Sequence, residues 1–202
     1  MRFFYCFILV FSFQFLTAQG EWELSKNKEG IKIYVKERKG YAVKEYRAEM
    51  ILKSSLDQLL KTILNGDKLH NWTYKTDSSK LLKKESDSVF YVYMYNDFPW
   101  PVKNRDHISK LTVTHPSSTS VKVSIESAPA YIPKKSGVVR VEDFSGFWLF
   151  EEVEGGVKVT QQLYGDPAGY LPDFIANSML VKAPYNTFLN LKKYLDKKSV
   201  MY

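Results

Sequence analysis

The amino-acid sequence predicts an α+β fold in which a curved antiparallel sheet grips one long C-terminal helix. Three patterns predict it: two strands and a helix near the start, consecutive strands from residue 80 to 163, and one helical pattern over 172–198. No repeat, low-complexity tract or interior linker divides the 202 residues. We therefore expect a single domain over residues 20–202, preceded by a segment that is not part of it.

The first strands and the helix after them are indicated by the spacing of apolar residues. Residues 31–35 alternate apolar and polar side chains, as in a half-buried strand. The chain then turns at Lys39-Gly40. In the next strand the apolar side chains share one parity, at Ala42, Tyr46, Ala48, Met50 and Leu52. Ser54-Ser55 suits the start of a helix that Asn65-Gly66 ends. This helix has apolar residues at helical spacing, namely Leu56, Leu59, Leu60, Ile63 and Leu64.

Between residues 80 and 163 the strands follow one another with turn residues between them. The expected strands are 80–84, 88–95, 107–114, 120–127, 137–143, 147–152 and 157–164. Glu154-Gly155-Gly156 predicts a tight hairpin between the last two. Short turns between neighbouring strands favour antiparallel pairing.

An apolar face predicts the C-terminal helix. Pro172 suits its first turn, and Asp173 complements the positive end of the helix dipole. The apolar face comprises Phe174, Val181, Phe188, Leu191 and Leu195. A helix over 172–198 would extend about 40 Å at 1.5 Å per residue. Pro184 is expected to bend it, because proline lacks the N–H donor and clashes with the preceding turn.

Residues 1–19 are expected to be a signal peptide. A basic start at Met1–Arg2, an apolar stretch over 3–16 and the small residues Thr17-Ala18 follow the order of such a peptide. The apolar stretch is shorter than the roughly 20 residues that span a bilayer, and an uncleaved anchor is the alternative. The single cysteine, Cys6, lies in this segment, so the mature chain has no disulfide. An exported chain without disulfides suits the periplasm or exterior of a bacterium.

Charge and missing motifs narrow the function classes. The formal net charge is +7, and loss of Arg2 with the leader leaves +6. The lysines are dispersed and form no arginine-rich run, so we expect no nucleic-acid partner, but transient contact with an anionic membrane surface. His70, His107 and His115 lie far apart, and there is no phosphate loop or nucleophile elbow. We therefore expect no catalytic residue, no metal site and no cofactor.

Aromatic residues are the first candidates for ligand contacts. Tyr91 and Tyr93 share one parity of a strand whose other parity is also apolar. They fit either an ordinary core with hydroxyls at its rim or the wall of a cavity. Phe98 and Trp100 lie in a proline-rich turn and fit either a loop folded onto the core or a lip over a pocket entrance.

Arg105 is a candidate because of its parity. If Leu111 faces inward, His107 and Arg105 continue the same face of the strand, whereas Asp106 faces the other way. An inward arginine needs an acceptor, because an unpaired buried charge costs several kcal/mol. That acceptor is either a fixed acid or a hydroxyl, carbonyl or carboxylate of a ligand.

Four segments together carry a family resemblance. They are Gly30–Tyr34 (GIKIY), Pro99–Asp106 (PWPVKNRD), Gly146–Trp148 (GFW) and Asp166–Asn177 (DPAGYLPDFIAN). By their order and spacing the chain resembles the START (steroidogenic acute regulatory protein-related lipid transfer) domain, over about residues 22–195. The resemblance implies a helix-grip fold, with a U-shaped sheet and a lid helix over an internal apolar tunnel.

The resemblance also implies roles for particular residues. Arg105 resembles the inward arginine of the family, Phe98–Pro101 the loop beside the tunnel mouth, and Phe174–Leu195 the lid helix. Many members pair that arginine with an acid on the neighbouring strand, whereas 89–95 contains none. Tyr91 or Tyr93 would then take its place.

The sequence thus predicts a non-enzymatic protein that binds a lipid, a sterol or another apolar small molecule. The candidate ligand contacts are Arg105, Tyr91, Tyr93, His107, Trp148, Phe174, Val181 and Phe188, with Phe98 and Trp100 at the entrance. Two alternatives stay open: a polyketide-cyclase-like enzyme that uses the same cavity, and an envelope protein-interaction module whose cavity is collapsed.

Overall fold

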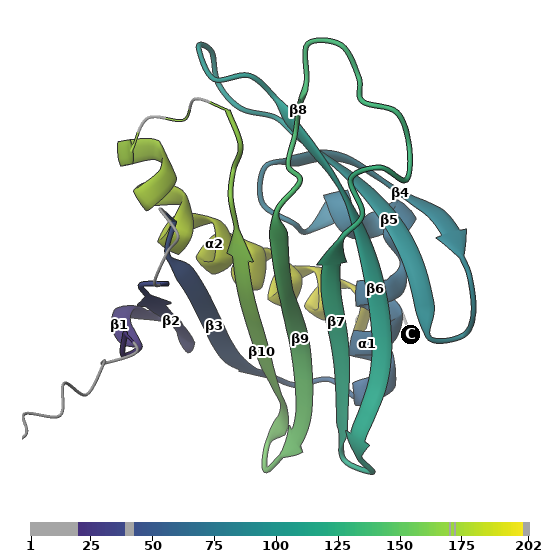
Figure 1. Ribbon diagram of the computed structural model, residues 1–202. Helices are drawn as coiled ribbons and strands as arrows, with labels where there is room; N and C mark the ends of the chain where they lie inside the picture. Colours follow the sequence, from purple (N-terminus) through teal and green to yellow (C-terminus); the bar gives the residue numbers. More distant parts are fainter. Residues whose placement is uncertain (1–19, 39–42, 170, 172, 200–202) are drawn as a thin grey trace, which may run out of the picture.

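The computed structural model describes residues 20–38, 43–169, 171 and 173–199. The expected signal peptide, the turn at Lys39-Gly40, Ala42 and Pro172 lie outside these residues. Within them, the elements follow in the order β1 (Glu23–Lys28), β2 (Ile31–Lys36), β3 (Glu45–Leu52), α1 (Leu56–Leu64), the 3₁₀ helix η1 (Gly66–Asn71), β4 (Thr76–Lys84), β5 (Val89–Asn96), β6 (Arg105–Ser117), β7 (Ser120–Ser127), β8 (Val139–Arg140), β9 (Phe144–Val153), β10 (Gly156–Gly165) and α2 (Asp173–Ser199) (Figure 1).

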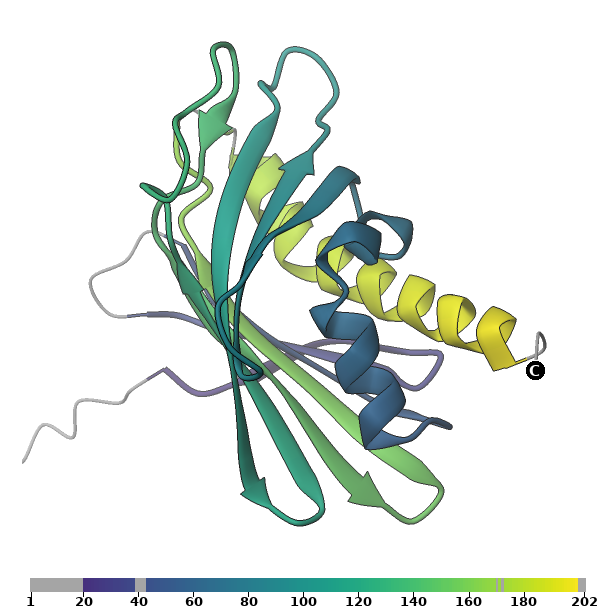
Figure 2. The ribbon, with the colours of Figure 1, turned by 90° about the vertical axis from the view of Figure 1, so that its right-hand side faces the viewer.

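The strands form one curved sheet around α2, as the sequence predicts. Their order is β1-β2-β3-β10-β9-β7-β6-β5-β4, with every pair along it antiparallel. β3 therefore pairs with β10, so the beginning and the end of the strand series meet inside the sheet. In Figure 2 the sheet curves around the helices, with α1 and α2 on its concave side.

The predicted hairpin between the last two strands is confirmed. Gly155 and Gly156 have φ angles of +87° and +144°, which glycine adopts readily. A Cβ at Gly156 would lie 2.2 Å from the Leu52 carbonyl oxygen, so this position also needs glycine for space. The turn brings Val153 opposite Gly156 and sets the β9–β10 register.

The predicted helix after β3 is confirmed with its cap. The Ser55 side chain accepts a hydrogen bond from the Gln58 backbone N–H at 3.2 Å. Leu59 and Ile63 are buried from this helix. Asn65 ends α1, and η1 then leads to the buried Trp72.

α2 supplies the helical layer of the core. It is continuous from Asp173 to Ser199, with Pro184 inside it. Phe188, Leu191 and Leu195 are at most 3 % exposed and belong to the same apolar cluster as Ile31 and Ile33 of β2. The second half of the predicted apolar face, from Phe188 to Leu195, is therefore the core face of the helix.

Two elements differ from the expected ones. β1 has exposed or half-exposed residues throughout, so its sequence shows no apolar alternation. The expected strand over 137–143 shortens to β8, which pairs in parallel with Arg105 and Asp106 at the start of β6. Gly137, whose φ is +77°, lies before β8, and residues 141–143 after it are not part of a strand.

Candidate ligand-binding cavity

A cavity of about 280 Å³ lies between the concave face of the sheet and the helices. Strands from both halves of the sheet, and α2, contribute to the mainly apolar wall of this cavity. Its apolar residues include Leu69, Trp72, Val92, Met94, Leu111, Ile125, Phe144, Trp148 and Leu163. A second cavity of about 150 Å³ under the first half of α2 shares wall residues with it, including Tyr46 and Pro167. Small-molecule pockets typically measure about 300–1,000 Å³, so this interior suits a compact apolar molecule.

The structure places His107 and Trp148, two of the predicted ligand contacts, in the wall of the larger cavity. His107 lies there with Ser109 and Leu111 of the same strand, which is the face of β6 that the parity predicts. The Trp148 ring stacks on Phe188, with ring centroids 5.6 Å apart.

The tyrosines of β5 lie on the other face of the sheet. β5 contributes Val92, Met94 and Asn96 to the cavity wall, which is the opposite parity. Tyr91 stacks on Tyr131 at 4.3 Å between ring centroids, and the Lys135 ammonium lies 4.6 Å from the ring centroid of Tyr93. The expectation that Tyr91 and Tyr93 line the cavity is therefore corrected: both side chains pack under a segment that covers the convex face.

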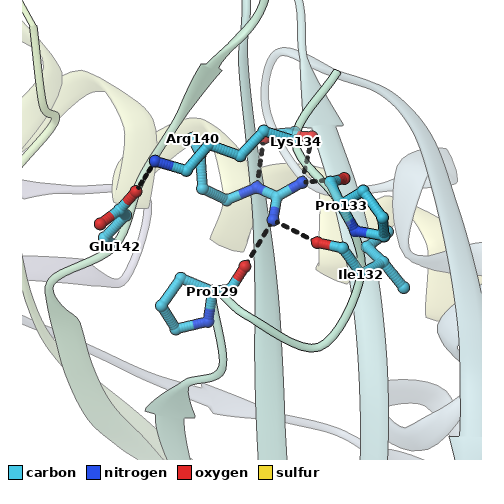
Figure 3. Close-up of polar contacts among 7 residues, drawn as sticks. Pro129, Ile132, Pro133, Lys134, Arg140 and Glu142 are labelled. Atoms are coloured by element: carbon cyan, nitrogen blue, oxygen red, sulfur yellow. Dashed lines mark hydrogen bonds and ion pairs between the residues drawn. The ribbon is translucent and has the colours of Figure 1, made fainter.

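That segment, residues 129–136, is termed the outer strap. Arg140 of β8 fixes it, as Figure 3 shows, by donating hydrogen bonds to the carbonyl oxygens of Pro129, Ile132 and Pro133 at 2.7–3.3 Å. Arg140 also forms a two-pronged ion pair with Asp106, at 2.6 Å from Nε and 3.0 Å from Nη2. Lys134 of the strap pairs with Glu142. Asp106 thus faces away from the cavity, as its parity predicts, and it pairs with the arginine that holds the outer strap.

Arg105 is buried and joins two loops at one end of the cavity. Its acceptors include the carbonyl oxygens of Lys103 at 2.7 Å, Pro167 at 3.0 Å and Ala168 at 3.4 Å. The guanidinium also lies 5.1 Å from the ring centroid of Phe98. Arg105 is not among the described residues that line the cavity, whereas Pro167, which it holds, is. Arg105 therefore connects the β5–β6 loop to the loop before α2 by hydrogen bonds to both.

The predicted entrance residues lie on the β5–β6 loop. Trp100 is 92 % exposed, while Phe98 is half-buried. The Asn104 side chain holds the loop, because its Oδ1 accepts from Phe98 N–H at 2.9 Å and its Nδ2 donates to Tyr95 Oη at 2.7 Å. In Figure 1 this loop lies at the same end of the sheet as the start of α2.

The helix residues of the prediction have different positions. Phe188 is fully buried in the core, and Val181 is partly buried against it. The side chain of Phe174 lies outside the described part of the structure. The α2 residues that line the cavity are Ala183, Pro184 and Thr187. Of these, only Pro184 was singled out by the sequence pattern, as a bend in the helix and not as a ligand contact.

The cavity wall carries little charge. In the larger cavity, exposed Asp166 is the one acid among the described lining residues, and these include no lysine or arginine, whereas Lys44 lines the adjoining smaller cavity. Burial lowers the pKa of His107 to about 4, more than the nearby Asp106 carboxylate raises it, so this imidazole is neutral near pH 7. Burial raises the pKa of Tyr46, so its phenol stays protonated.

Two wall residues that sequence reasoning missed form a polar pair. Tyr46 Oη on β3 donates a hydrogen bond to Gln161 Oε1 on β10 at 3.0 Å. The two residues are far apart in sequence, and their strands meet only in the folded sheet. The inward parity of Tyr46 was the only sequence signal, and it did not indicate a partner.

The described residues include no group of three or more histidine, cysteine or acidic side chains placed to hold a metal ion. Among them, no helix is both apolar and long enough to cross a bilayer.

The curved sheet, the gripped terminal helix and the cavity between them define the helix-grip class of proteins. Within that class, the model of the START domain family matches residues 7–196, so this chain belongs to the START domain family.

Relatives of known sequence or structure agree with this membership. A STAR-related lipid transfer protein from Xanthomonas axonopodis, solved by crystallography, is 34 % identical with a TM-score of 0.82, covering 87 % of this chain and 98 % of that one. An uncharacterised protein of Pseudomonas aeruginosa is 31 % identical over 88 % of each chain. Mouse (Mus musculus) phosphatidylcholine transfer protein is 27 % identical over 78 % of this chain and 75 % of its own.

A more distant structure supports the fold alone. Human StAR-related lipid transfer protein 5 has a TM-score of 0.76 at 16 % identity, over 91 % of this chain and 89 % of its own. The relatives from Xanthomonas axonopodis and mouse are lipid transfer proteins by name and not enzymes, which agrees with the non-enzymatic role that the sequence predicts.

Proposed function

We propose that this chain binds one lipid-like or other bulky apolar molecule in the cavity beneath α2, and that it sequesters or carries this molecule. The mainly apolar cavity of about 280 Å³ is the observation that carries the proposal. Each Å² of apolar surface that leaves water contributes roughly 25 cal/mol before the costs of binding. The lipid-transfer names of the relatives support the same class of ligand.

The volume of the cavity limits the size of the ligand. Its volume is near the lower end of the range for small-molecule pockets, even when the adjoining 150 Å³ is included. A single compact apolar molecule suits this space. A phospholipid with two long chains would require α2 or the loops at its first half to move outward.

We place the exchange of ligand with a membrane at the end that carries Trp100. An exposed indole suits the interface between lipid headgroups and acyl chains. Arg105 connects the loop of Trp100 to Pro167 in the cavity wall. A loop that contacts lipid would therefore be mechanically linked to the cavity. The net positive charge of the chain favours an anionic surface.

The proposal includes a location for ligand binding outside the bacterial cytoplasm. The order of basic, apolar and small residues over 1–19 supports export, and the lack of any cysteine after Cys6 suits the periplasm or exterior of a bacterium.

Native mass spectrometry and lipid extraction of protein purified from its own host test the proposal. We expect one apolar molecule per chain, and exchange of that molecule when a panel of lipids is added. A protein that carries nothing and binds no lipid of the panel would contradict the proposal. Each lipid should also be recovered unchanged, since formation of a product would favour the cyclase-like alternative.

A further inference from the structure

The outer strap on the convex face has no part in the proposed function. None of its residues, 129–136, is buried. Two ring contacts hold it from the outside: Tyr131 stacks on Tyr91 at 4.3 Å between centroids, and the Lys135 ammonium lies 4.6 Å from the ring centroid of Tyr93. Segments with few buried contacts open locally while the rest of a protein stays folded. The strap is therefore suited to open without disturbing the sheet beneath it.

One polar group under the strap lacks a partner. Tyr93 is 6 % exposed, and its Oη forms no hydrogen bond with any described residue. A buried hydroxyl without a partner is unfavourable, and this one would bond to water if the strap lifted. Hydration of Tyr93 thus offsets part of the contacts that an open strap would lose.

The ion pair that holds the strap shares its backbone with the cavity wall. Asp106 and Arg140 pair on the convex side. His107 and Val141, the residues that follow them in the chain, line the larger cavity, because successive residues of an extended chain point to opposite faces. The Val141 N–H also donates to the Asp106 carbonyl oxygen at 2.9 Å. A molecule in contact with His107 or Val141 therefore acts directly beside the ion pair.

A second connection runs through the loops at the end of the cavity. The Asn104 carbonyl oxygen accepts from the Val139 N–H at 2.9 Å, and the Asn104 side chain holds the β5–β6 loop. Arg105 donates to the carbonyl oxygen of Pro167, which lines the cavity. Three consecutive residues, 104–106, thus join the entrance loop, the cavity wall and the arginine that holds the strap.

We propose that the outer strap is a conformational switch, in which a ligand in the cavity favours the closed strap over an open one. Ligand loading would thereby change the surface on the side of the sheet opposite the cavity. This inference rests on the proposed function, because the molecule that closes the strap is the ligand of the same cavity.

Hydrogen exchange measured by mass spectrometry, with and without Nile red, tests the inference. Nile red is an apolar dye whose fluorescence reports its binding, and a lipid of the panel that binds can take its place. The peptide over 128–141 includes the Val139 and Val141 amides, which hold β8 beside β6. We expect it to exchange at least about threefold more slowly when the cavity is filled. The β9–β10 hairpin over 151–158, at the other end of the sheet (Figure 1), is the internal reference and should slow by less.

The double variant Asp106→Leu/Arg140→Leu removes the connection without leaving an unpaired charge. Its strap peptide should exchange at one rate with and without Nile red, while the dye still binds. Arg47→Leu/Glu49→Leu is the matched control, because it removes an ion pair of 3.2 Å from β3, outside the strap. We expect this control to keep the threefold response. Circular dichroism checks that both double variants fold.

Tyr131→Ser tests the coupling in the reverse direction and leaves the ion pair in place. The ring is 39 % exposed, so its loss creates no cavity in the core. Without the stacking on Tyr91, the strap of the empty protein should exchange faster. Because coupling between two events is reciprocal, Nile red should also bind about twofold more weakly. This variant decides the inference if Asp106→Leu/Arg140→Leu does not fold.

The outcomes separate the switch from the proposed function. The switch is overturned if the strap peptide exchanges equally with and without Nile red, or if the reference hairpin slows as much as the strap. It is also overturned if the slowing persists in Asp106→Leu/Arg140→Leu, or if Tyr131→Ser binds Nile red as tightly as the wild type. Each of these results leaves ligand binding intact. If neither Nile red nor any lipid of the panel binds, the proposed function itself fails.

Discussion

At the scale of residues, the ion pair of Arg140 and Asp106 is the most demanding polar contact. Both side chains are 1 % exposed, so either charge alone would be buried without its partner. Arg140→Leu is therefore expected to lower the free energy of unfolding by about 3–5 kcal/mol. The double variant Asp106→Leu/Arg140→Leu should regain much of that loss, because no unpaired charge remains. Urea unfolding followed by circular dichroism measures both. Equal losses in the two variants would show that the strap carbonyls, and not Asp106, account for the effect.

His107 makes the stability of the folded protein depend on pH. Its folded pKa of about 4 lies below the ordinary value of 6.5, so the unfolded chain binds the proton more readily. The contribution of His107 to stability is complete above pH 6.5 and is lost as the pH falls toward 4, by roughly 3 kcal/mol in all. Unfolding measured at pH 7 and pH 4 in the wild type and in His107→Gln checks this. The wild type should lose more stability than the variant, and equal losses would contradict the assigned pKa.

Residue-scale prediction from the sequence succeeded where one parity was unambiguous. The β6 parity places His107 on the cavity side and Asp106 on the other. β5 has apolar side chains on both parities, because the outer strap covers its convex face, so Tyr91 and Tyr93 could not be assigned to a face. The hydrogen bond between Tyr46 and Gln161 forms only in the folded sheet, because the β3–β10 pairing brings together residues that are far apart in the sequence.

At the scale of elements, the two halves of α2 differ in burial. Among the described side chains none from 175 to 183 is buried, whereas Pro184, Tyr185, Phe188, Leu191 and Leu195 are. Tyr185 also donates from its hydroxyl to Glu29 Oε2 at 2.9 Å, which ties the second half to the β1–β2 turn. Pro184 separates the halves and removes one hydrogen bond of the helix. We infer that the first half of α2 opens to admit ligand while the second half stays in place.

Hydrogen exchange measured by mass spectrometry tests this division of α2. Amides before Pro184 should exchange at least about tenfold faster than those after Phe188, because fewer buried contacts oppose local opening. Pro184→Ala restores the missing donor and should slow exchange in the first half. Tyr185→Phe serves as the comparison, since it loosens the second half instead. Uniform protection along the whole helix would exclude a hinge at Pro184.

Elements were predictable from the sequence where packing gives one buried face. β2, α1 and α2 each bury one side, and the apolar spacing shows it. β1 buries neither side, so its polar sequence does not distinguish it from a loop. β8 is held by the buried Arg140 and by two residues of β6, and a strand of this length leaves no periodic pattern.

At the scale of the whole molecule, the net positive charge and the exposed indole of Trp100 predict that the protein binds to membranes. The proposed contact combines an indole that enters the lipid interface with long-range attraction between a positive chain and an anionic surface. The first term is local to Trp100, whereas the second belongs to the entire chain. Vesicle binding should therefore depend on both, and the two terms can be varied separately.

Trp100→Ser is expected to weaken binding to vesicles that contain anionic lipid by about tenfold. The reason is that the variant lacks the indole, whose apolar surface would otherwise leave water and enter the membrane. Raising the salt from 0.05 M to 0.5 M should weaken binding of the wild type and of the variant by similar factors, since salt screens only the charge term. Tyr131→Ser removes an exposed aromatic ring from the outer strap and should leave binding unchanged. Co-sedimentation with vesicles of matched size, with and without anionic lipid, measures all three. Equal binding of Trp100→Ser and the wild type would remove the β5–β6 loop from the contact, and loss of binding in Tyr131→Ser alone would place the contact on the convex face instead.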